Sequence, residues 1–194
     1  TIIGFVKREI NKITKLREEI ADLLGTLDIP LKDLEKAEIT TTKEGAEKAN
    51  QLIEELSAEL QYLLRSSGIP LQKWGKGDAK TFNHLLNEIL LGETTLDTAK
   101  DGRLTRKVGV STIDITYKNL RLVEERQIFE DGRVRIREMS ATVNEKIMPG
   151  ETPVQAARRG LEEELGIKKA SGLKKVQTKN RIIESPSYPG LASQ

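Results

Sequence analysis

Apolar residues recur at spacings of three and four along the first hundred residues, which is the pattern of amphipathic helices. The first run is Val6, Ile10, Ile13, Ile20, Leu24 and Leu27. The second run is Ala49, Ile53, Leu56, Leu60 and Leu63. Arg17 stands where the first run would place another apolar side chain, and the segment Thr41-Thr42-Lys43-Glu44 before the second run has the form of a capping box. These stripes predict an antiparallel helical pair with a buried seam, because helices so short and charged need packing to be stable.

A turn and a third helix follow. Trp74-Gly75-Lys76-Gly77-Asp78 is predicted to be a turn, with Trp74 packing where the helices meet the next element. The Gly-x-Gly with its lysine also has a phosphate-binding interpretation, but it lacks the flanking strand and the longer glycine pattern of such loops. A short amphipathic helix is predicted from Phe82, Leu85, Leu86, Ile89 and Leu90, ending at Gly92. His84 falls beside that stripe, so we expect a half-exposed helix residue rather than a catalytic one.

From Val108 the period changes to two, which indicates strands. Val110, Thr112, Asp114 and Thr116 alternate with Ser111, Ile113, Ile115 and Tyr117. The alternation continues over residues 120–129, and Asp131-Gly132 predicts a hairpin. Its return strand, residues 133–139, would carry Val134 and Ile136 on one face and three arginines on the other. We expect the arginine face to be solvated; an anion-facing wall is the alternative.

Residues 145–153 then predict a loop that leads into a helix over residues 153–165. Thr152 is placed to cap the helix, Pro153 suits its first position, and Gly166 would end it. The expected apolar stripe consists of Val154, Ala157, Leu161 and Leu165. At about 100° per residue, Glu163 and Glu164 share a face with position 160, whereas Glu162 points away from it.

The stretch from Pro149 to Ile167 resembles the Nudix box, G-x5-E-x7-R-E-U-x-E-E-x-G-U, in which U is a bulky apolar residue. Position by position, the matching residues are Glu151, Arg159, Leu161, Glu163, Glu164, Gly166 and Ile167. The resemblance implies a mixed sheet packed with a helix, catalytic roles for Glu163, Glu164 and Arg159, and Mg2+ or Mn2+ held by Glu151, Glu163 and Glu164.

Two positions depart from the pattern. Glu145 stands in place of the opening glycine, and Gly160 in place of the glutamate that follows the arginine. Hard cations need several oxygen ligands in fixed geometry, so the loss of one carboxylate predicts weak metal binding and poor activation of an attacking water. Gly160 also costs a helix interior about 1 kcal/mol relative to alanine, unless close packing against another element requires a glycine.

Composition narrows the classes of function. The chain of 194 residues has 32 basic and 30 acidic residues, which gives no strong signal for nucleic-acid binding. Cysteine is absent and histidine occurs once, so thiolate chemistry and sites built on paired histidines are excluded. No apolar run approaches the roughly 20 residues of a membrane span. A basic stretch after the box, residues 168–181, is expected to be solvated; neutralising the phosphates of a nucleotide or polyanion is the alternative reading.

The sequence therefore predicts an α+β protein with a domain boundary near residues 95–105. Residues 1–95 would form a helical hairpin that docks onto a protein partner or a larger assembly. Residues 104–194 would form a Nudix-like domain that is incomplete at its C-terminal end. This domain would act in binding, with a nucleoside diphosphate as candidate ligand, or would serve as a structural subunit. The alternative is a Mg2+-dependent pyrophosphohydrolase of nucleoside diphosphate derivatives. We expect a soluble intracellular protein, with a plastid as one candidate compartment because the chain begins at Thr1.

Overall fold

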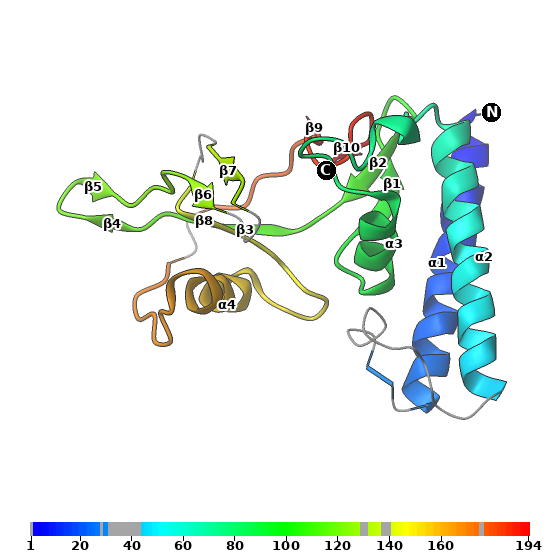
Figure 1. The fold of residues 1–194 in the computed structure, drawn as a ribbon, viewed down its shortest axis with the longest axis horizontal. Coiled ribbons are helices and arrows are strands. Elements are labelled where there is room, and N and C mark those ends of the chain that lie inside the picture. Colours follow the sequence, from blue (N-terminus) through cyan, green and yellow to red (C-terminus); the bar gives the residue numbers. More distant parts are fainter. Residues whose placement is uncertain (1, 28, 31–43, 129–131, 137–140, 175–176) are drawn as a thin grey trace. The chain divides into compact units, whose positions relative to one another are not determined.

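The chain is an α+β protein that divides into two compact units (Figure 1). The computed structural model describes residues 2–27, 29–30, 44–128, 132–136, 141–174 and 177–194. Unit 1 consists of Thr1–Val108 together with Lys179–Gln194, and unit 2 consists of residues 109–178. The segment that resembles the Nudix box lies wholly in unit 2.

Two long helices of unit 1, α1 (Ile2–Thr26) and α2 (Glu44–Ser66), run antiparallel (Figure 1). The predicted seam between them is confirmed, although Leu52 is buried where Ile53 was expected and Leu27 is exposed. Arg17, the polar residue in the stripe, donates from Nε to the carbonyl oxygen of Leu90, 3.3 Å away. The predicted capping box at residues 41–44 lies almost entirely outside the described residues. None of the described helices is both long and apolar enough for a bilayer span.

The turn after α2 is compact and well anchored. A short 3-10 helix, η2 (Leu71–Lys73), ends at Trp74, which is buried as predicted. Gly75 and Gly77 both have positive φ, which a glycine adopts without a steric penalty. Helix α3 (Phe82–Leu90) follows as predicted, although it ends at Leu90, two residues before the expected Gly92. His84 is exposed and completes a capping box, accepting from the backbone N–H of Thr81 at 3.2 Å.

The sheet of unit 1 contains the end of the chain. Strands β1 (Thr95–Thr98) and β2 (Leu104–Lys107) form an antiparallel hairpin. Strand β10 (Ala192–Ser193) pairs in parallel with β2, and β9 (Ile183–Glu184) pairs antiparallel with β10, giving the order β1-β2-β10-β9. The region 95–105, where the sequence placed the domain boundary, therefore carries a hairpin of unit 1. Residues 179–194, assigned from the sequence to the second domain, complete the sheet of the first.

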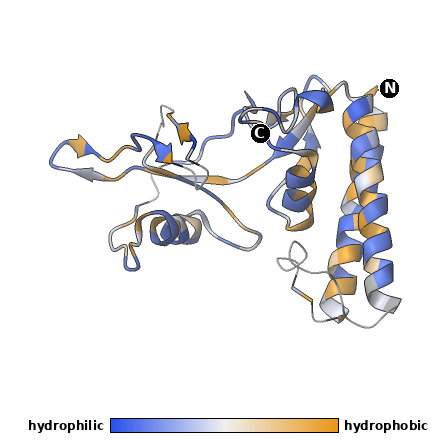
Figure 2. Cartoon of the chain, in the orientation of Figure 1, coloured by the Kyte–Doolittle hydropathy of each residue, from blue (hydrophilic) through white to orange (hydrophobic). Residues whose placement is uncertain are grey.

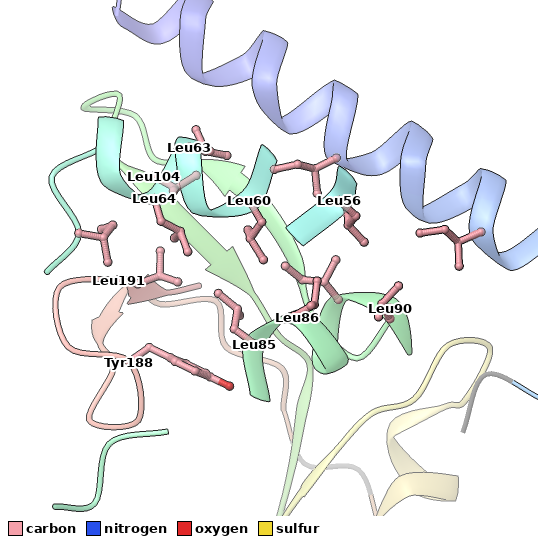
Figure 3. Packing of buried hydrophobic residues seen from close by; sticks show 14 of the residues in the cluster. Leu56, Leu60, Leu63, Leu64, Leu85, Leu86, Leu90, Leu104, Tyr188 and Leu191 are labelled. Carbon is pink, nitrogen blue, oxygen red and sulfur yellow. The ribbon is translucent and has the colours of Figure 1, made fainter. Parts of the chain in front are cut away.

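The core of unit 1 joins segments far apart in the chain. Figure 3 shows side chains of α2, α3, β2 and the C-terminal segment converging, among them Leu60, Leu85, Leu104 and Leu191. Tyr188 lies in the same cluster and is completely buried. The surrounding segment, residues 185–190, has an irregular backbone, yet its tyrosine belongs to the core.

Unit 2 is built on one strand pair and one helix. Strands β3 (Val110–Ile113) and β8 (Val143–Lys146) are antiparallel, with Ser111 opposite Glu145. Helix α4 (Pro153–Leu165) packs on this pair. The buried core consists of Ile113, Val143, Ala157 and Leu161. The sequence predicted a strand here, and the structure buries Ser111 and Ile113 on one face of β3. It missed β8, because residues 145–153 were interpreted as a loop.

Two further hairpins in unit 2 leave apolar side chains exposed. Strands β4 (Thr116–Tyr117) and β5 (Leu120–Arg121) join through Lys118 and Asn119, both with positive φ. Strands β6 (Gln127–Ile128) and β7 (Val134–Arg135) pair across the predicted Asp131-Gly132 turn, although Asp131 itself lies outside the described residues. Figure 2 shows apolar residues on β5 and β7. The apolar face predicted for the return strand is solvent-exposed, since Ile136 is 78% accessible.

Candidate functional site around Arg159

Helix α4 carries most of the candidate residues, and local sequence fixes its ends. Thr152 caps the first turn by accepting from the backbone N–H of Gln155, whose side chain accepts in return from the backbone N–H of Thr152 at 2.8 Å. Pro153 occupies the first turn, and Gly166 ends the helix in the left-handed region at φ 68°. These three predictions are confirmed. The stripe differs at its end: Leu165 is exposed, while Ala156 and Gly160 are buried.

Arg159 gathers two carboxylates and a carbonyl into a single group, called here the Arg159 cluster. Its guanidinium donates to both carboxylate oxygens of Glu151, at 3.2 Å from Nε and 2.9 Å from Nη2. It also donates to Glu145 Oε1 at 2.6 Å and to the carbonyl oxygen of Lys146 at 2.7 Å. Paired contacts of this kind are among the stronger hydrogen bonds in proteins. Through these contacts, Arg159 connects helix α4 to strand β8 and to the loop that precedes the helix.

Electrostatics keep this cluster charged. The Arg159 guanidinium holds the pKa of Glu151 below its usual value, and the backbone N–H of Met148, 3.0 Å from Glu151 Oε2, acts in the same direction. Burial opposes both effects, but the hydrogen bonds outweigh it. The same contacts raise the pKa of Arg159, and the hydrogen bonds that it donates to Glu151 are the largest cause. Glu151 and Arg159 therefore serve each other as permanent counter-ions near neutral pH.

The two remaining carboxylates of the predicted site point outward. Glu163 and Glu164 are both exposed on α4. Glu163 approaches Arg159 to 3.5 Å, one helical turn along, with 57% of its side chain accessible. An ion pair this exposed contributes little, typically 0–1 kcal/mol. The structure thus brings Glu151 and Glu163 to the same arginine, where Glu151 contacts Nε and Nη2 and Glu163 lies nearest Nη1.

These residues do not fit a firmly held divalent cation. Mg2+ requires near-octahedral oxygen ligands, but both oxygens of Glu151 are engaged by Arg159 and Gly160 supplies none. In the part of the chain that the structure describes, no three acidic or histidine side chains are grouped as metal ligands. Only Glu163 and Glu164 remain accessible for this role, so the predicted weak binding of Mg2+ or Mn2+ would rest on them.

The sequence missed one charged group altogether, in unit 1. The Glu88 carboxylate is buried and accepts from Lys80 Nζ at 2.7 Å, Arg106 Nη1 at 2.9 Å and Thr94 Oγ1 at 3.1 Å. Arg106 also donates from Nε to Ser193 Oγ at 2.8 Å and lies over the Tyr188 ring. No motif signals this group, because Glu88 and Arg106 look like surface charges in the sequence. It attaches the C-terminal strand to the core of unit 1.

Two other candidate phosphate-binding segments were considered from the sequence: the Gly75–Gly77 segment and the basic stretch at residues 168–181. The Gly75–Gly77 segment forms a turn closed by a hydrogen bond from Gly75 N to the Lys80 carbonyl oxygen. The described basic residues after the box are exposed; they are Lys168, Lys169, Lys174, Lys179 and Arg181. Lys175 lies outside the described residues. Their interaction with phosphate groups stays a prediction.

Comparison with known proteins identifies no relative: no family model, no curated protein and no solved structure matches the chain. The interpretation of the Arg159 cluster therefore rests on its own residues and geometry.

Proposed function

We propose that this chain is a Nudix-like module with a degenerate catalytic motif that acts in binding or as a structural subunit of an assembly. The observation that carries the proposal is the engagement of Glu151. Arg159 contacts both of its carboxylate oxygens, and position 160 holds a glycine. Two of the four positions expected to assemble a metal-dependent hydrolytic site are thus unavailable as ligands.

Exposed apolar surface in unit 2 supports the assembly role. A large apolar set on its hairpins and connecting segments is accessible; it includes Leu120, Leu122, Val123, Ile128, Val134 and Ile136. Soluble monomers seldom leave so many large apolar side chains exposed without an interaction partner. Two-stranded hairpins are also marginal alone in water. We therefore propose that further polypeptide covers this surface.

The helices of unit 1 were expected to provide the partner surface, but their seam is buried, which changes where on them a partner could bind. The α1–α2 seam packs within unit 1, so a partner would bind elsewhere on these helices. An open, mainly apolar groove along α2 is a candidate, lined by Ile53 and Tyr62 of α2 and Leu86 of α3. Tyr62 is 53% accessible and stacks edge-on against Phe5.

The alternative function is the Mg2+-dependent hydrolysis of nucleoside diphosphate derivatives. The exposure of Glu163 and Glu164 on the same helix favours it, since both carboxylates are accessible to a cation. In that case Arg159 would act only by holding Glu151 and strand β8 in place.

Calorimetric titration of the full chain with Mn2+ tests the proposal. We expect no saturable binding in the micromolar range, and no difference between the natural chain and the matched Glu163→Gln/Glu164→Gln variant. Saturable micromolar binding that the variant loses would contradict the proposal and favour the hydrolase.

A further inference from the structure

The two departures from the Nudix-type pattern contact one another. Gly160 is buried on the face of α4 that packs on strand β8. A Cβ atom at position 160 would lie 2.9 Å from Glu145 Cβ, 3.1 Å from its Cγ and 3.3 Å from its Oε2. Carbon atoms that are not bonded attract best at about 3.5–4.0 Å and repel at shorter separations. Any side chain at position 160 therefore requires Glu145 or the helix to move.

Glu145 is not free to move away. Its backbone is paired with Ser111 of β3, so the position of its Cβ is set by the strand. Its carboxylate is held by Arg159 Nη1 at 2.6 Å, and only 16% of its side chain is accessible. The closest clash involves Cβ, the rigid root of the side chain, rather than its flexible end.

We propose that residues 145 and 160 are coupled: the Glu145 side chain of strand β8 fills the space that a side chain at position 160 of α4 would need, and it takes Arg159 as its counter-ion. This inference deepens the proposed function, on which it rests. The helix position closest to Glu163 and Glu164 is occupied by the strand's side chain. The charge of that side chain is neutralised inside the protein by a guanidinium.

The coupling reverses an ordinary expectation about Gly160. A glycine in a helix interior is less stable than alanine, so replacing it should strengthen α4 wherever space allows. Here the added methyl group meets Glu145. Gly160→Ala should therefore weaken α4 in the natural chain and strengthen it when residue 145 is glycine.

The experiment is a double-mutant cycle read by hydrogen exchange of the α4 amides in the full chain. The variants are Gly160→Ala, Glu145→Gly and their combination, with Glu145→Ala plus Gly160→Ala as the matched control that keeps the Cβ but removes the carboxylate. We expect Gly160→Ala to speed exchange in α4 at least threefold in the natural chain and with Glu145→Ala. It should slow exchange when compared with Glu145→Gly alone.

The same effect of Gly160→Ala in all backgrounds, or slower exchange in the natural chain, would overturn the inference. If Glu145→Gly unfolds unit 2, the sign of the effect of Gly160→Ala in the natural chain still decides the question.

A second experiment titrates the double variant Glu145→Gly/Gly160→Glu with Mn2+. We expect it to bind Mn2+ at least tenfold more tightly than the single variant Gly160→Glu. Equal Mn2+ binding by the two variants would contradict the coupling of residues 145 and 160. Mn2+ binding by the natural chain would refute the proposed function but leave the coupling of residues 145 and 160 standing, so the two failures are distinguishable.

Discussion

Truncating Tyr188 should strongly destabilise unit 1, although the residue lies only six positions before Gln194, the last residue of the sequence. Its side chain is fully buried, with its ring centroid 5.0 Å from that of Trp74 and the Arg106 guanidinium 4.9 Å away. Replacing a buried aromatic side chain by alanine costs about 3–5 kcal/mol. With a urea dependence of roughly 2 kcal/mol per molar, Tyr188→Ala should lower the unfolding midpoint by about 2 M.

Trp74 is the only tryptophan of the chain and is itself buried, so its fluorescence reports this transition directly. Tyr188→Phe keeps the ring contacts and should lose no more than about 1.5 kcal/mol. Tyr117→Ala is the matched control, because Tyr117 is 69% accessible and lies in unit 2. An unchanged midpoint for Tyr188→Ala would refute the placement of the C-terminal segment in the core.

Three further results are expected. Leu60→Asp should unfold the helical pair, because a buried unpaired charge costs several kcal/mol. Far-UV circular dichroism should show the loss of helix, whereas the control Glu55→Ala, at an exposed position of the same helix, should change little. An intact Leu60→Asp protein would mean that the seam is not buried. The pKa of Glu151 is lowered in the folded state, so the ionised carboxylate stabilises the fold above its ordinary pKa of 4.5, and this stabilisation is lost as the pH falls below that value. Glu151→Gln should therefore make the midpoint of thermal unfolding less dependent on acid pH. An unaltered pH dependence in this variant would contradict the Arg159 cluster. Trypsin should cut after exposed basic residues such as Lys168, Lys174 or Lys179, and the released C-terminal peptide should stay bound to unit 1 in native mass spectrometry rather than dissociate.

Local signals made helix α4 and the helical seam predictable. The capping threonine, the proline beside it and the terminal glycine act on backbone groups within a few residues, so their effects are readable without the fold. The seam is likewise set by spacing along each helix, and it differs from the prediction in that Leu52 is buried where Ile53 was expected and Leu27 is exposed.

Contacts between distant residues could not be predicted in the same way. Trp74 Nε1 donates to the carbonyl oxygen of Pro189, 115 positions later, and nothing near Pro189 signals that contact. Strand β8 was read as a loop because only its pairing with β3 makes it a strand. The reason for a glycine at position 160 lies in Glu145 on that strand. The sequence indicated that both residues depart from a pattern, but their contact required the fold.

A turnover assay decides whether the chain is an efficient hydrolase. The full chain should be assayed with Mg2+ and with Mn2+ on a panel of nucleoside diphosphate derivatives, beside the Glu163→Gln/Glu164→Gln variant. We expect both proteins to release phosphate or nucleotide products at the same background rate. Efficient turnover by the natural chain that disappears in the variant would contradict this expectation and establish an enzyme.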